Sequence, residues 1–80
     1  MLESPMPEKW SDLEVAAQRC EFAAQELEQA ALHLRTSAQH FPEREVPRAC
    51  AHLFAAQGHM LEGQAVIHER AIVHAAKSNP

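Results

Sequence analysis

The sequence predicts an all-α protein, an antiparallel two-helix hairpin that self-associates into a four-helix bundle. Three observations indicate this fold class: small and large residues alternate with a seven-residue period, a helix-start pattern precedes them, and a proline-bearing segment divides the chain. The 80 residues form one domain with a marginal core. A chain of this length buries only about 60% of the surface that its unfolded form exposes, so association is expected to supply the missing burial.

The first helix is expected over residues 11–41, after a flexible arm at residues 1–10. Ser11 and Glu14 are spaced as a capping box, in which each side chain satisfies a free backbone amide of the first turn. Two rows with a seven-residue period follow, which predict a helix packed closely against another helix. The small row is Trp10, Ala17, Ala24, Ala31 and Ala38, and the large row is Leu13, Cys20, Leu27, Leu34 and Phe41.

A turn is expected over residues 42–46, because Pro42 disfavours helical geometry in the residue before it. Pro47 suits the first position of a second helix, which is expected over residues 47–77. A connection this short makes the two helices antiparallel. The second helix has matching rows, so the two seams are expected to interdigitate. Its small row is Ala49, Ala56 and Gly63, and its large row is Val46, Leu53, Met60 and Ile67.

The apolar sector of the second helix spans nearly half of its circumference, more than one partner helix covers. Its outer part, the stripe Phe54, Leu61, Ala65 and Ile72, is therefore the predicted oligomer interface. On the first helix, Val15 and Phe22 lie opposite the seam and offer a surface for a protein partner. The layering of Ala against Leu resembles that of the Rop family of RNA-binding hairpins, which dimerise into four-helix bundles. The resemblance concerns architecture alone, because the first helix here is mainly acidic.

Metal-ligating residues are present but follow no established motif. Cys20 and His68 are expected at the same level of the two helices, with Glu21 nearby, so the three are weak candidates for a metal site. The spacings typical of zinc and di-iron helices do not occur. We therefore expect no cofactor, and we expect His68 to be buried and neutral beside a small core cysteine.

Charge and hydropathy exclude several classes of partner and location. The net charge of −4 argues against a nucleic-acid partner, and no apolar run is long enough for a membrane span. The first residues lack the features of a signal peptide, so a cytoplasmic location is expected, with reduced cysteines. The sequence also contains no catalytic signature, which favours a protein that is not an enzyme.

The sequence is best interpreted as a small, homo-oligomeric interaction or regulatory module. One alternative is a small secretion-apparatus subunit or its chaperone, which this chain resembles in size, in its N-terminal Trp10 and in its proline-bearing turn. Another alternative is a helical bundle that binds a metal or cofactor through His, Cys and Glu side chains.

Overall fold

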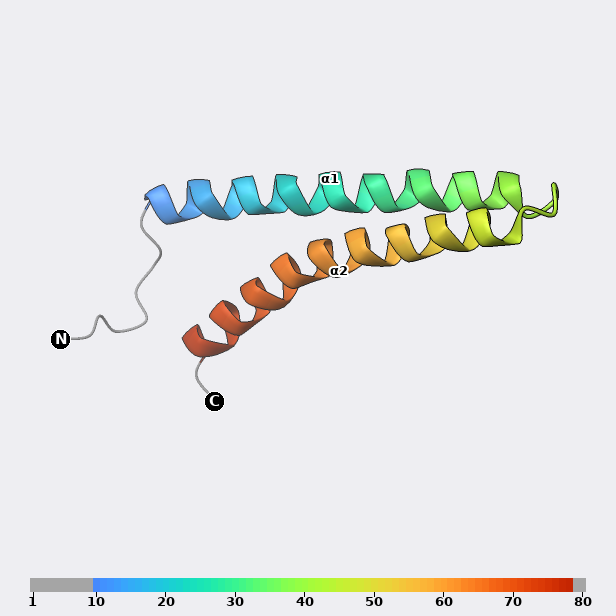
Figure 1. The fold of residues 1–80 in the computed structure, drawn as a ribbon. Coiled ribbons are helices and arrows are strands. Elements are labelled where there is room, and N and C mark those ends of the chain that lie inside the picture. The colour runs from blue at the N-terminus through green and yellow to red at the C-terminus, as the bar shows by residue number, and fades with distance from the viewer. Residues whose placement is uncertain (1–9, 79–80) are drawn as a thin grey trace.

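The computed structural model describes residues 10–78, which form two helices lying side by side (Figure 1). Helix α1 spans Trp10–His40 and helix α2 spans Val46–Lys77. The helices pack against each other, and the described residues contain no strand. This confirms the all-α helical hairpin. Residues 1–9 of the predicted N-terminal arm lie outside the described part of the chain.

The two helices begin differently. Since α1 begins at Trp10, Ser11 lies within its first turn and is not the N-cap residue that the predicted capping box requires. Helix α2 has Glu45 as its N-cap residue, but the Glu45 side chain makes no capping hydrogen bond. Pro47 lies in the first turn of α2, where the missing amide hydrogen has no helical partner to lose.

The turn between the helices wraps around the carbonyl group of His40. The backbone amides of Glu43 and Glu45 both donate to this oxygen, each at 3.1 Å. Arg44 has a φ of 63°, in the left-handed region that a side chain disfavours. The turn places the Glu45 side chain beside His40, the last residue of α1.

The seam between the helices consists of small residues on both sides. The predicted row Ala49, Ala56 and Gly63 of α2 is buried, which confirms that part of the prediction. On α1, however, the buried residues are Ala23, Ala30 and Ser37. The predicted small row of α1 is therefore wrong by one position, since adjacent residues of a helix point about 100° apart. Of that row, Ala17, Ala24 and Ala38 are exposed and Ala31 is half-buried.

The large residues are the second departure from the prediction. Leu27 and Leu34, expected within the seam, are each more than 40% exposed, and no large side chain of residues 11–78 is fully buried. The hairpin thus has a narrow seam of small residues in place of a core. The backbone of α2 approaches α1 closely at Gly63. A Cβ atom built on Gly63 would lie only 3.2 Å from Cγ of Leu27.

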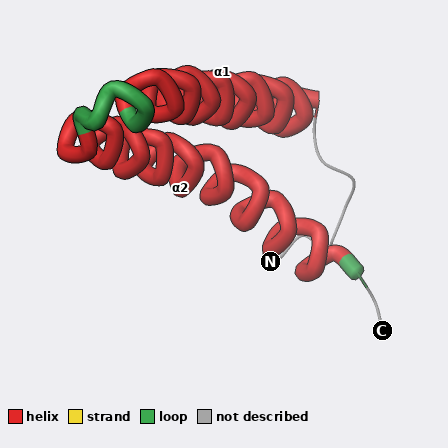
Figure 2. The backbone as a smooth tube through the Cα atoms, turned by 90° about the vertical axis from the view of Figure 1, so that its right-hand side faces the viewer, coloured by secondary structure: helices red, strands yellow, loops and turns green. Residues whose placement is uncertain are grey.

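The helices diverge away from the turn. Figures 1 and 2 both show α2 curving away from α1 over its second half. The seven-residue series that begins with Ala49, Ala56 and Gly63 continues with Arg70 and Lys77. Long side chains thus follow the small ones, and the spacing between packed helices depends on the side chains at the contact. Between residues 10 and 78, neither helix has a stretch long and apolar enough to cross a bilayer.

Candidate functional site

One edge of the seam carries a continuous column of histidines. His33 and His52 form the centre, with their Nδ1 atoms 2.9 Å apart and their ring centroids 5.2 Å apart. His59 stacks on His33 at 5.4 Å between ring centroids, and His40 stacks on His52 at 5.7 Å. We call this arrangement the histidine column. It arises because His33 and His40 are seven residues apart on α1, as are His52 and His59 on α2.

A carboxylate closes each end of the histidine column. Nδ1 of His59 donates to Oε1 of Glu26 at 2.7 Å, and Nδ1 of His40 donates to Oε1 of Glu45 at 2.8 Å. Within residues 11–78, every buried side-chain nitrogen or oxygen has a hydrogen-bond partner. The column therefore joins the helices through satisfied polar contacts, which is the condition under which polar groups are tolerated in a seam.

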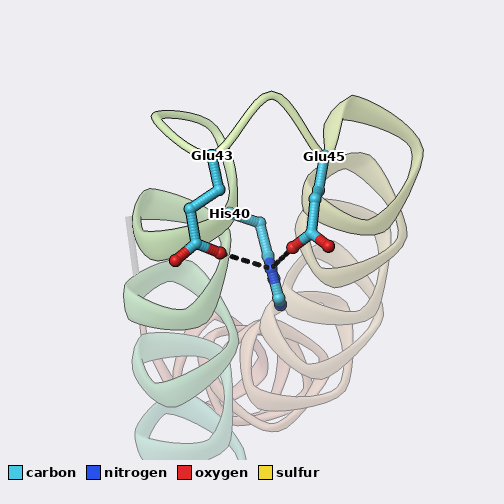
Figure 3. A group of neighbouring side chains, drawn as sticks. All are labelled: His40, Glu43 and Glu45. Atoms are coloured by element: carbon cyan, nitrogen blue, oxygen red, sulfur yellow. Dashed lines mark hydrogen bonds and ion pairs between the residues drawn. The ribbon is translucent and has the colours of Figure 1, made fainter.

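The end of the column at the turn is its most highly charged part (Figure 3). His40, Glu43 and Glu45 point their ligand atoms toward one another, and we call them the turn cluster. The hydrogen bond from His40 lowers the pKa of the Glu45 carboxyl, and the positive charge of Arg48 lowers this pKa further. Arg48 lies on the other oxygen of the same carboxylate, with Nη1 3.5 Å from Oε2.

The opposite edge of the seam is apolar. On α1 the residue three positions after Ala30 is His33 of the histidine column, and the residue four positions after it is Leu34. Because the polar rows of the two helices meet at one edge, their large apolar rows share the other edge. The resulting surface, which we call the leucine face, is exposed. It consists of Leu13, Leu27, Leu34, Phe41, Val46, Leu53 and Ile67.

The predicted interaction residues lie beyond the leucine face. All four residues of the outer stripe, Phe54, Leu61, Ala65 and Ile72, are exposed, and Phe54 is 76% exposed. Val15 and Phe22 of α1 are exposed as well. Each of these residues is available to a partner in the hairpin.

The predicted metal candidates are not brought together. Cys20, Glu21 and His68 are all exposed, so the expectation that His68 is a buried neutral group is wrong. Among the described residues, the turn cluster alone places three or more His, Cys, Asp or Glu ligand atoms within 4.8 Å of one another. Cys20 and Cys50 are both free thiols.

A cleft of about 430 Å³ opens where the helices diverge. Val15, Ala16 and Cys20 line it from α1, and Val66 and Val73 line it from α2. Two residues that line this cleft form an ion pair between the helices, with Nη2 of Arg19 2.9 Å from Oε1 of Glu69. The lining thus combines apolar side chains with charged ones, which are Asp12, Arg19, Glu69, Arg70 and Lys77.

No protein-family model, curated protein or solved structure matches this chain.

Proposed function

We propose that this protein is a non-enzymatic interaction module that acts as a homo-oligomer, with the cytoplasm as its expected location. In the simplest assembly, two hairpins form a four-helix bundle whose interior is made by their leucine faces. We take the helices of each hairpin to be antiparallel, because Arg19 near the start of α1 pairs with Glu69 near the end of α2.

The exposure of the leucine face carries the proposal. Thirteen large apolar residues of the described chain are exposed, while the seam buries alanine, glycine, serine and a single valine. A fold of this size gains most of its stability from burying large side chains, each of which contributes about 1.5–3 kcal/mol. A second copy brought against the leucine face supplies that burial without any change in the hairpin.

The pattern of the leucine face fits a second copy in particular. Its large residues follow a seven-residue register along both helices, with Cys20 and Met60 at the intervening positions, and Ala24 and Ala31 lie beside them on α1. Alternating large and small residues allow two such faces to interdigitate. The outer stripe of α2 continues the apolar surface past Gln57 and Gln64, so it lies at the margin of the same interface.

Sedimentation equilibrium of the full chain at micromolar concentration tests the proposal. The expected mass is at least twice the 8.9 kDa of one chain. Leu27→Glu and Leu53→Glu, on the two helices of the leucine face, should each reduce the mass to that of a monomer or unfold the chain. Leu61→Glu, in the outer stripe, should weaken the assembly less.

Leu32→Glu is the matched control, because Leu32 is an exposed leucine of α1 that points away from the leucine face. This variant should keep the wild-type mass. A well-folded monomeric wild-type chain would contradict the proposal. Dissociation by Leu61→Glu but not by Leu27→Glu would assign the interface to the outer stripe instead.

A further inference from the structure

We propose that the turn cluster His40, Glu43 and Glu45 binds a divalent transition-metal ion of the Zn²⁺ type. This inference does not depend on self-association. It rests on the geometry of the three side chains, on the contacts that hold them in place, and on the chemistry of their ligand atoms.

The three ligand atoms lie within 4.8 Å of one another, and one pair already has the separation that a single ion requires. Two ligand atoms that each lie about 2.0–2.2 Å from an ion, at an angle of about 90–110°, are about 2.8–3.6 Å apart. Nδ1 of His40 lies 2.8 Å from Oε1 of Glu45 and 3.9 Å from Oε1 of Glu43. The second distance needs only a small movement of Glu43, whose side chain is 67% exposed. Figure 3 shows both carboxylates facing the same ring nitrogen.

The side chains of His40 and Glu45 are held in place by further contacts. The ring of His40 stacks on His52 with an interplanar angle of 15°, and its side chain is only 18% exposed. Arg48 holds Oε2 of Glu45, which leaves Oε1 directed at His40. Contacts of this kind fix the orientation of the ligand atoms. The backbone holds the third ligand, because the amide of Glu43 donates to the His40 carbonyl.

The donor set selects the class of ion. One imidazole nitrogen with two carboxylate oxygens suits Zn²⁺, whereas Ca²⁺ and Mg²⁺ favour ligands that are all oxygen. Three protein ligands leave the remaining positions of a four- or five-coordinate ion to water. In the absence of an ion, Nδ1 of His40 contacts the same two carboxylates, so binding replaces these contacts by bonds to the metal.

The site lies where an ion affects the hairpin most directly. His40 is the last residue of α1, and Glu45 is the residue before the first residue of α2. An ion bound by both fixes the ends of the two helices to each other, and it binds the folded chain better than the unfolded one. Zn²⁺ is therefore expected to raise the melting temperature in proportion to the logarithm of its concentration above the dissociation constant.

Titration of the full, phosphine-reduced chain with Zn²⁺, followed by calorimetry and by thermal melts, tests the inference. One ion should bind per chain, and the melting temperature should rise. Glu43→Gln should weaken binding about tenfold or more with little change in the metal-free melting temperature, because this side chain is mostly exposed. Glu45→Gln should also weaken binding. The Co²⁺ complex should show no thiolate charge-transfer band, since Cys20 and Cys50 are not ligands.

Two control variants separate the turn cluster from other sites. Glu62→Gln removes an exposed carboxylate of α2, and His33→Gln removes the centre of the histidine column; both should keep the wild-type affinity to within a few-fold. Failure of the wild-type chain to bind Zn²⁺, or equal affinity in wild type and Glu43→Gln, would overturn the inference. So would a loss of binding in His33→Gln that Glu43→Gln does not share.

Discussion

Gly63 of α2 lies directly against Leu27 of α1, so that a Cβ atom built on Gly63 would stand 3.2 Å from Cγ of Leu27. The same Cβ atom would stand 3.3 Å from the carbonyl oxygen of Ala23. Both distances are shorter than an ordinary van der Waals contact. The close approach of the helices at this level therefore depends on the absence of a side chain at position 63.

Gly63→Ala should destabilise the fold by about 1 kcal/mol. Alanine gains about 1 kcal/mol in helix propensity. Its methyl group would crowd the carbonyl oxygen of Ala23 and Cγ of Leu27, and overpacking of this kind costs about 1–3 kcal/mol, which outweighs the gain. Gly58→Ala is the matched control, because nothing lies within 4 Å of a Cβ atom at Gly58. That variant should gain about 0.5–1 kcal/mol. Urea unfolding of both variants at one protein concentration measures the contrast, and equal effects of the two substitutions would contradict the assignment.

Ser37→Ala should cost about 0.5–1 kcal/mol, although alanine is the better helix former. Oγ of Ser37 donates to the carbonyl oxygen of Ala49 at 2.7 Å, and Ser37 is buried. This hydrogen bond joins the two helices near the turn, and bonds of this kind contribute about 1 kcal/mol each. Thr36→Ala removes a hydroxyl that bonds only within α1, to the carbonyl of Leu32. Thermal melts should show a loss for Ser37→Ala and none for Thr36→Ala; similar losses in both would argue against the interhelical role.

His33 and His52 should prove energetically coupled. Their 2.9 Å contact requires a proton on one Nδ1 and a free lone pair on the other. His33→Leu leaves His52 without this partner and should cost about 1 kcal/mol, as should His52→Leu. The double variant should lose less than the sum of the two, by about 1 kcal/mol, because neither polar group remains. His68→Leu, on an exposed part of α2, should be near neutral. Additive losses in the double variant would show that the contact contributes little.

The helices and the turn were predictable from the sequence because their signals are local. Pro42 and Pro47 mark the division of the chain, and no proline or glycine interrupts α1. The register of the seam was not predictable in the same way. Alanines occur in adjacent pairs at residues 16–17, 23–24 and 30–31, so α1 carries two small rows one position apart. Only the register that buries Ala23 and Ala30 brings His33 opposite His52, and this depends on both helices together.

The histidine column and the turn cluster also depend partly on local sequence and partly on how the two helices pair. The seven-residue spacing of His33 and His40, and of His52 and His59, is visible in the sequence and would have predicted the histidine column once one cross-helix pair was known. Cys20 and His68 pair in the sequence analysis because they lie at the same distance along the two helices. That distance gives a position along the helix axis but not the direction around it. The turn cluster was harder to foresee, because Glu45 returns to His40 through the left-handed conformation of Arg44.

Arg44→Gly should stabilise the fold by about 0.5–1 kcal/mol. The φ of 63° at Arg44 brings the Cβ atom of an L-residue close to its own backbone, at a cost of about 1–2 kcal/mol that glycine avoids. The greater freedom of glycine in the unfolded chain offsets part of this gain. Arg35→Gly, the same substitution at an exposed position within α1, should instead cost about 0.5–1 kcal/mol, because glycine lowers helix propensity there. Urea unfolding of the two variants should therefore shift the midpoint in opposite directions. A loss of stability in Arg44→Gly equal to that in Arg35→Gly would mean that the turn does not hold Arg44 in the left-handed conformation in solution.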